Sequence, residues 1–268
     1  MAAVLTNPRS DRVKAVRALS RQSGRLRAGL FLAEGPQVVR EAVRWRPELV
    51  RELYLTAEAA ARHRPIVEAA GRAGVTAVEV TPTVLAAMGD TEAPQGVLAV
   101  CRLADVPLEP ALARLPAGGV VCVLTHVRDP GNAGTVIRSA DAAGADLVVV
   151  SDASVDVHAP KVVRSTAGSL FHLPIVSGVP VQAVLAGLRS SGVALLAADG
   201  GGAALLPEVD LRRPHAWVMG NEAWGLEPQV RDACDEVVRV PIYGAAESLN
   251  LAMAATLCLY ASAAARRR

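Results

Sequence analysis

Residues 120–146, VVCVLTHVRDPGNAGTVIRSADAAGAD, set the pattern for the second half of this chain. An apolar run, VVCVLT, gives way to a polar, glycine-containing turn and then to a helical pattern in which Ala133, Val136, Ile137 and Ala140 share one face. A strand that is apolar throughout is typical of a sheet covered by helices on both faces. The stretch therefore predicts one β–turn–α unit with a polar turn at the carboxyl end of its strand.

The same pattern repeats towards the end of the chain. Further apolar runs read DLVVVS, LPIVS, VALLAAD, AWVMG and EVVRVPI, with helical stretches between them. This alternation predicts a mostly parallel, doubly wound α/β sheet of about six strands. The sequence has no GxGxxG after the first strand and no GxxxxGK[ST], which disfavours a dinucleotide-dependent oxidoreductase or a P-loop protein.

The first hundred residues predict a smaller α/β domain. Helical patterns at 10–21, 36–45 and 57–73 alternate with the strand-like runs VRELYLT and VTAVEV, and a short helix in TPTVLAAMG precedes a strand in QGVLAVCRL. Residues 104–118 hold three prolines and end in glycine, a composition typical of a linker. We therefore expect domains at 1–103 and 119–268, joined by a linker at 104–118.

Composition limits the compartment and the cofactors. Apolar residues make up 51% of the chain but aromatic residues only 3%, so alanine, valine and leucine must build the core. The apolar runs are too short to span a membrane, and the N-terminus lacks the pattern of a secretion signal. The four cysteines are far apart and form no CxxC pair, which predicts core thiols in a reducing cytoplasm and no metal site.

Charge is distributed unevenly along the chain. Residues 1–72 carry 14 Lys and Arg against 7 Asp and Glu, and seven of these basic residues fall between Arg9 and Arg27 with one acid, Asp11. Such a segment suits the neutralisation of phosphates, which points to nucleic acid as a partner. A solvated basic helix face is the alternative, and charge alone does not separate the two.

Three segments place polar side chains and glycines where a strand ends: 125–146, WVMGNEAWGLEP (217–228) and VPIYGAAESLNLAMAA (240–255). The carboxyl ends of parallel strands are where an open α/β sheet keeps its ligand site. Each segment also has a purely structural interpretation, because Asn132 and Ser248 suit helix N-caps and Glu222 suits an exposed turn. The helix expected at about 248–264 is apolar almost all round, which indicates burial on more than one side and a subunit interface.

Together the three segments resemble the motifs of a known family. NxGxxxR (Asn132, Gly134, Arg138), GNExxG (from Gly220) and PxxGxxESLN (from Pro241) resemble, in order and spacing, those of the SpoU/TrmH family, the RNA 2′-O-ribose methyltransferases of the SPOUT superfamily. The opening NPRSDRVKAVRAL…GLFLAEGPQVVREA resembles that family's N-terminal substrate-binding domain. The resemblance covers nearly the whole chain. Ala223 departs from it, since the family more often has glycine there.

The resemblance implies a C-terminal trefoil knot, an S-adenosylmethionine pocket built by that knot, an RNA substrate and a homodimer. Mapped onto this sequence, it implies cofactor contacts at Gly220, Val240, Ile242, Leu249 and Ala198.

The catalytic residues follow from the same motifs. The family's suggested base matches Arg138, but an arginine is a poor proton acceptor because its pKa exceeds 12. We expect Arg138 instead to orient a phosphate or hydroxyl of the target and to stabilise the developing alkoxide. Glu222 would hold that guanidinium or the substrate, while Asn132, Ser248 and Asn250 would shape the pocket by hydrogen bonding.

Three functions stay open at this point: a ribosomal RNA methyltransferase, a transfer RNA methyltransferase, and a non-catalytic RNA-binding protein of the same fold. The basic N-terminal domain favours a large folded RNA, and the intact polar set counts against a binding module. Two further features have alternatives. His126 is either a titrating group or a structural histidine. The segment KVVRSTAGSLFHLP either presents Lys161, Arg164 and Ser165 to RNA or only joins a helix to a strand.

Overall fold

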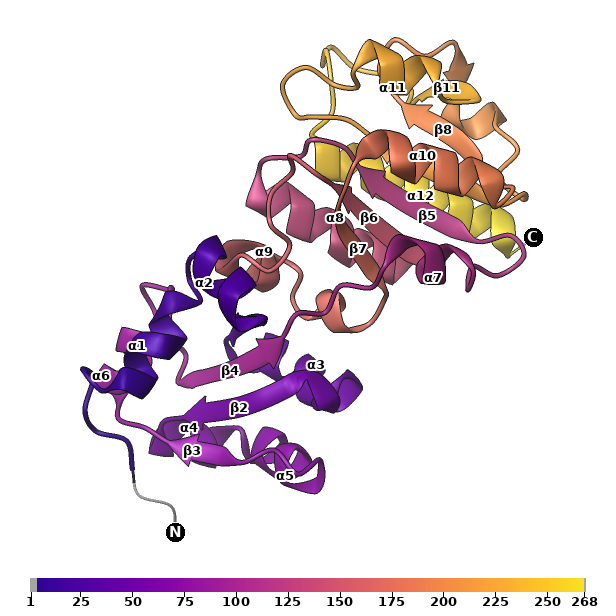
Figure 1. Cartoon of the computed structure of the whole chain (residues 1–268). Coiled ribbons are helices and arrows are strands. Elements are labelled where there is room, and N and C mark those ends of the chain that lie inside the picture. The colour runs from indigo at the N-terminus through magenta and orange to yellow at the C-terminus, as the bar shows by residue number, and fades with distance from the viewer. Residues whose placement is uncertain (1–3, 268) are drawn as a thin grey trace. The chain divides into compact units, whose positions relative to one another are not determined.

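The computed structural model of the chain describes residues 4–267 (Figure 1). The chain forms two compact units. One combines residues 1–104 with 158–172, and the other combines 105–157 with 173–268. We call them the small unit and the large unit.

The large unit is built on a parallel sheet. Within residues 4–267, seven strands follow the order β7-β6-β5-β10-β8-β11-β9, and all neighbouring pairs run parallel. The strands are β5 (Val120–Leu124), β6 (Leu147–Ser151), β7 (Ile175–Val179), β8 (Ala194–Ala198), β9 (Ala204–Leu205), β10 (His215–Met219) and β11 (Glu236–Arg239). The predicted mostly parallel α/β fold is confirmed. The sequence did not reveal β9, because two residues are too few for an apolar run.

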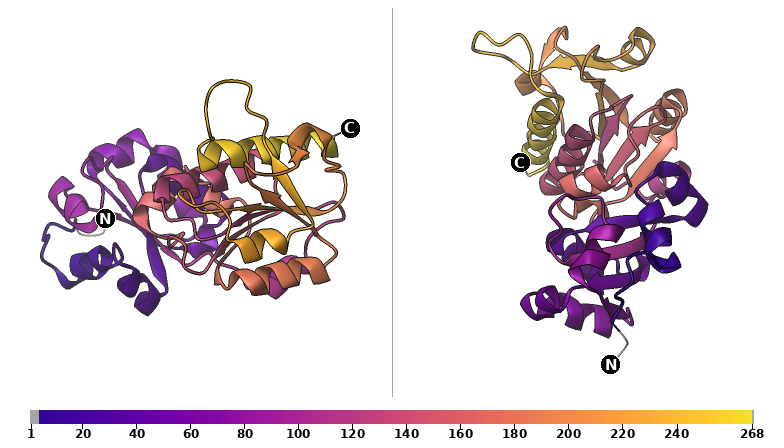
Figure 2. Two further views of the ribbon diagram at one scale, coloured as in Figure 1. Left: turned by 90° about the horizontal axis from the view of Figure 1, so that it is seen from above. Right: turned by 90° about the vertical axis from the view of Figure 1, so that its left-hand side faces the viewer.

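Helices cover both faces of this sheet. α8 (Pro130–Ala143) and α12 (Leu251–Arg266) pack side by side on one face, and α10 (Val181–Ser190) covers the other (Figure 2). α7 (Leu108–Leu112), α11 (Pro228–Asp232) and the 3-10 turn η3 (Leu206–Glu208) complete the unit. Val123, Val149, Leu195 and Val218 are therefore fully buried, which is why the strands read as apolar throughout.

The chain leaves the sheet after β11 and returns to it as α12. The intervening loop projects away from the sheet (Figure 2, left). Residues 242–250 of this loop are exposed. The trefoil knot predicted for this segment stays a prediction.

Both predicted helix caps of the large unit are wrong by a few residues. α8 begins at Pro130 and its N-cap is Asp129, whose carboxylate accepts a hydrogen bond from the Asn132 backbone N–H at 2.7 Å. α12 begins at Leu251, and its cap is Asn250, not Ser248. Because another residue caps each helix, N-capping does not account for Asn132 or Ser248, and their side chains are free for other contacts.

A buried polar cluster anchors α12 to β10. The Ser262 hydroxyl lies 2.8 Å from the indole nitrogen of Trp217 and 2.7 Å from Nε2 of His215. Burial lowers the pKa of His215, which favours the neutral ring. Its Nδ1–H then donates to the Arg213 carbonyl oxygen, and Nε2 accepts the Ser262 hydroxyl proton. The C-terminal helix is thus held by hydrogen bonds as well as by apolar packing.

The small unit is a four-stranded sheet with helices on both faces. Its strands follow the order β1-β4-β2-β3, with β1 and β2 antiparallel to β4. The strands are β1 (Leu30–Glu34), β2 (Val50–Leu55), β3 (Ala77–Glu79) and β4 (Val97–Arg102). The helices are α1 (Asp11–Ala18), α2 (Gln22–Ala28), α3 (Pro36–Trp45), α4 (Ala57–Arg62), α5 (Arg64–Arg72), α6 (Pro82–Met88) and α9 (Pro160–Ser165), with the 3-10 turns η1 (Pro47–Leu49) and η2 (Ser169–Phe171).

Two predictions in the small unit need correction. β1 was not predicted. It lies between Gly29, which ends α2 with a φ of +65°, and Gly35, which precedes α3 with a φ of +93°. The helix predicted at 57–73 is broken at His63, because Pro65, in the first turn of α5, has no backbone N–H to continue the hydrogen bonding of α4.

The units also differ from the predicted domain limits. The expected linker contains α7, and Leu108, Ala111 and Leu112 belong to the apolar core of the large unit. Residues 158–172 belong to the small unit, where the Phe31 ring lies 4.7 Å from the His158 ring and 6.1 Å from the Phe171 ring.

The segment 158–172 does not present all of its predicted RNA contacts. Arg164 forms an ion pair of 3.1 Å with the buried Glu34. This ion pair within the small unit explains the presence of Arg164 without an RNA contact.

All four cysteines lie within the described residues and are free thiols, and three of them are buried. Burial raises the pKa of Cys101 and Cys122 to about 12, so these thiols stay protonated. This agrees with the predicted core thiols. Among residues 4–267, no helix has the length and apolar character to span a bilayer.

Candidate methyl-transfer site

A pocket of about 580 Å³ opens at the carboxyl ends of β8, β10 and β11 in the large unit. This position agrees with the rule for ligand sites in open α/β sheets, and the volume falls within the range of about 300–1,000 Å³ that small-molecule sites occupy. All five predicted cofactor contacts line it: Ala198, Gly220, Val240, Ile242 and Leu249. Of the predicted catalytic residues, Glu222 and Ser248 line it as well.

The second segment forms one wall through a tight loop. Asn221 and Gly225 exchange two backbone hydrogen bonds of 2.8 and 3.0 Å. A Cβ atom on Gly220 would overlap the backbone of Gly225 and Leu226, so the loop closes only because residue 220 is glycine. Gly220 is thus required by the loop itself, in addition to the predicted approach of a ligand.

Glu222 joins the second segment to the first. Its carboxylate accepts hydrogen bonds from the backbone N–H groups of Arg128 at 3.3 Å and Asp129 at 3.1 Å, and from the side-chain amide of Asn132 at 3.3 Å. These donors surround the first turn of α8, where the helix dipole also favours a negative charge.

Asn132 and Asn250 extend this connection to the third segment. The side-chain amide of Asn250 donates to the side-chain oxygen Oδ1 of Asn132 at 3.1 Å, while Oδ1 of Asn250 caps α12. A hydrogen-bonded chain therefore runs from the start of α12 through Asn250 and Asn132 to Glu222. Four of the five predicted catalytic residues are brought to one place, three of them through this chain and Ser248 as a lining residue of the pocket.

Arg138 stands apart from this set. It is exposed on α8 and does not line the pocket. Within residues 4–267, no hydrogen bond or ion pair involves its guanidinium, so the expected pairing with Glu222 is not formed in this chain. Its charge is available to a substrate.

Sequence reasoning missed Asn221 and left the role of His126 open. The buried Asn221 side chain donates to the His126 carbonyl oxygen at 2.7 Å and accepts from the Ala223 N–H at 2.8 Å, which fixes the second segment against the first. Its place in GNExxG was the available signal. His126 has a φ of +54° and its Nδ1 lies 3.4 Å from Glu227, outside the pocket lining. These contacts favour the structural interpretation of His126.

The α/β fold places a pocket of small-molecule size beside a polar hydrogen-bonded cluster, an arrangement typical of enzymes that bind a small ligand. Residues 119–260 match the SpoU rRNA Methylase family, and residues 10–99 match the MRM3-like substrate binding domain. The chain belongs to the SpoU rRNA methylase family, and it is a methyltransferase of that family. The prediction of the family from the three motifs is confirmed.

Similar proteins cover nearly the whole chain. The 23S rRNA (guanosine(2553)-2'-O)-methyltransferase RlmP of Bacillus subtilis (strain 168) is 32% identical over 96% of this chain and 97% of its own length. The AdoMet-bound rRNA methyltransferase from Sinorhizobium meliloti has a TM-score of 0.84 and 28% identity, covering 97% of both chains. The SpoU methyltransferase AviRb from Streptomyces viridochromogenes, in complex with the cofactor AdoMet, has a TM-score of 0.83 and 32% identity, covering 97% of this chain and 99% of its own.

Proposed function

We propose that this protein transfers a methyl group from S-adenosylmethionine to a ribose 2′-hydroxyl of ribosomal RNA. The observation that carries the proposal is the pocket at the ends of β8, β10 and β11, with the chain Glu222–Asn132–Asn250 beside it. Relatives named as rRNA 2′-O-methyltransferases, and neighbours solved with AdoMet, support the reaction and the donor.

The charge and the chemistry of the pocket lining suit the donor. Its lining includes the carboxylates of Asp199, Glu222 and Glu247 against one guanidinium, that of Arg239. A negative lining suits a sulfonium cation. The backbone at Gly220 and the apolar side chains of Ile242 and Leu249 supply close contacts for the neutral parts of the molecule.

The donor supplies an already activated methyl group, so the protein has to align the hydroxyl and help remove its proton. Glu222 is held by three donors, and its position relative to the first turn of α8 is therefore fixed. Asn132 and Asn250 lock the third segment to the first. Ser248 offers a hydroxyl inside the pocket. Arg138 contributes the positive charge that orients the target and stabilises the developing alkoxide.

We also propose that the protein works as a homodimer in the cytoplasm. Met253, Leu257 and Tyr260 lie on one stripe of α12 and are each about half exposed, at 53%, 47% and 51%. An apolar stripe on a C-terminal helix is covered by a second copy more readily than by water. The free thiols suit a reducing compartment.

The dimer proposal predicts a solution mass of about twice 27.8 kDa in sedimentation velocity. Leu257→Glu places a charge in the stripe and is expected to shift the protein towards the monomer. Ala186→Glu, at an exposed position of α10 on the opposite face of the sheet, is the control. A wild-type protein that sediments as a monomer at micromolar concentration would contradict the proposal.

The substrate class is tested by transfer of labelled methyl from S-adenosylmethionine to ribosomal RNA and, in parallel, to transfer RNA. We expect ribosomal RNA to be labelled at least tenfold faster. Preferential labelling of transfer RNA would overturn the choice of substrate. Label that enters only the assembled ribosomal subunit would keep the rRNA proposal and define the particle as the substrate.

A further inference from the structure

We propose that the small unit contains a second RNA-binding site, in which one pocket receives an unpaired nucleobase and an adjoining basic concavity receives the neighbouring phosphates. The proposal rests on the proposed function, because it takes RNA as the substrate. It adds a recognition site in the small unit, built from residues that take no part in methyl transfer.

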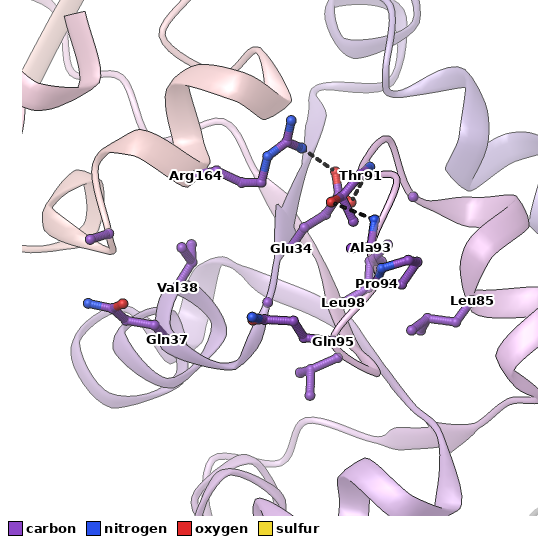
Figure 3. Close-up of a pocket in the computed structure, with 14 residues that line it drawn as sticks. Glu34, Gln37, Val38, Leu85, Thr91, Ala93, Pro94, Gln95, Leu98 and Arg164 are labelled. Carbon is purple, nitrogen blue, oxygen red and sulfur yellow. Dashed lines mark hydrogen bonds and ion pairs between the residues drawn. The ribbon is translucent and has the colours of Figure 1, made fainter. Parts of the chain in front are cut away.

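The base pocket has about 230 Å³ and lies between the start of α3 and the loop that leads into β4 (Figure 3). Its floor is apolar, with Val38, Leu85 and Leu98, and its rim is polar. The volume is below the range of about 300–1,000 Å³ typical of sites for drug-sized ligands, so a single ring system fits better than a whole nucleotide.

The carboxylate in this pocket is already satisfied. Glu34 accepts hydrogen bonds from the backbone N–H groups of Asp90 at 3.0 Å and Thr91 at 3.2 Å, and its other oxygen pairs with Arg164 (Figure 3). The second guanidinium nitrogen of Arg164 lies 3.7 Å from Asp90. The charged residues of the lining are Glu34 and Arg164, one of each sign, so the lining carries no net charge that would repel RNA.

Two amide side chains at the rim are available to a ligand. Gln37 comes from the first turn of α3 and Gln95 from the loop before β4, so they approach from different elements (Figure 3). Both are exposed, and no hydrogen bond reaches either side-chain amide from the described part of the chain. An amide pairs a donor with an acceptor, the arrangement that reads the edge of a base. Unpaired bases are what proteins read in RNA by such contacts.

The basic concavity lies on α1 and α2 and has about 490 Å³. Its lining contains Lys14, Arg17, Arg21 and Arg27 and no acidic residue. Among residues 4–267, the guanidinium groups of Arg21 and Arg27 have no ion pair or hydrogen bond. Arg25, in contrast, is buried and donates to the carbonyl oxygens of Leu19 and Ser20, so it serves the fold. Lys14 pairs with Asp11 at 3.1 Å, so Arg21 and Arg27 are the lining residues whose charges are free to bind phosphates.

Arg17 joins the two sites. It lines the basic concavity, and its guanidinium donates to the carbonyl oxygen of Gly89, which lines the base pocket. A strand of RNA that places phosphates on α1 and α2 can thus turn a base into the neighbouring pocket. On this proposal the basic segment binds phosphates, and Arg25 is its structural member.

Single-stranded homopolymers of A, C, G and U and a ribosomal RNA fragment serve as probes for the full chain. We expect the wild type to prefer one homopolymer. Two variants should lose this preference: the double variant Gln37→Ala, Gln95→Ala, and Ala93→Trp, which fills the pocket from an exposed rim position. Their KM for rRNA should rise about tenfold, with kcat and cofactor affinity unchanged. Ala61→Trp, on the exposed face of α4, is the matched control.

The salt dependence of RNA binding tests the phosphate contacts of the basic concavity. Arg21→Ala with Arg27→Ala should lower the slope of log K against log salt by about two and leave base preference intact. Equal binding of all four homopolymers by the wild type, or rim variants that behave like Ala61→Trp, would overturn the base pocket. If Ala93→Trp melts early, the double glutamine variant decides. Absence of methyl transfer by the wild type would instead overturn the proposed function, since homopolymer binding is measured without it.

Discussion

Replacing Arg138 with alanine is expected to lower kcat for methyl transfer by about 100- to 1,000-fold, the usual effect of removing one donor that stabilises a developing oxyanion. The side chain is exposed on α8 and has no partner among residues 4–267, so its loss should not disturb the fold. Affinity for S-adenosylmethionine should stay within about twofold, because Arg138 does not line the pocket. Single-turnover transfer and calorimetric titration of the donor measure the two quantities.

Two further variants sharpen this result. Arg138→Lys keeps the charge but loses the planar fork of the guanidinium, so partial activity would assign part of the effect to charge alone. Arg114→Ala removes the same charge from an exposed position of the large unit outside the pocket and should leave the rate unchanged. An Arg138→Ala protein that methylates RNA as fast as Arg114→Ala would exclude Arg138 from catalysis.

Replacing Gly220 with alanine is expected to weaken S-adenosylmethionine binding at least tenfold and to destabilise the protein by about 1–3 kcal/mol, the usual cost of overpacking. The added Cβ would overlap the backbone of Gly225 and Leu226, so the loop that carries Glu222 has to open. Opening it separates Glu222 from Asn132 and widens the pocket. Donor titration and chemical denaturation give the two effects.

The same pocket provides a matched control. Gly244 also lines it, but a Cβ at that position meets no atom within 4 Å. Gly244→Ala should therefore bind the donor and unfold like the wild type. If Gly220→Ala and Gly244→Ala bind the donor equally well, the loop is not the wall of the donor site.

The sequence predicts the parts of the fold that depend on long apolar runs. The six main strands of the parallel sheet and the family follow from such runs and from three spaced motifs. β9 has only two residues, and β1 is five residues long between two glycines, so neither produces a period that can be recognised in isolation. The segment 158–172 belongs to the small unit because of packing around Phe31, which is distant in sequence.

The site, like the fold, was predicted only in part from the sequence. The motifs identify Glu222, Asn132 and Asn250, but the hydrogen bonds that link them join residues about 90 and 118 positions apart and become visible only in three dimensions. The helix caps were misplaced because Asp129 and Asn250 compete with Asn132 and Ser248 as equally good capping residues. The exposed Arg138 shows that membership of a motif does not ensure contact with the pocket in one chain.

The position of the transferred methyl group on the nucleotide decides whether the protein methylates ribose. RNA labelled by the protein with S-adenosylmethionine would be hydrolysed completely in alkali and its products separated by charge. A 2′-O-methyl group blocks cleavage of the adjacent phosphodiester, so we expect label in an alkali-resistant dinucleotide. Label that appears in mononucleotides would place the methyl group on a base and would contradict ribose methylation by this site.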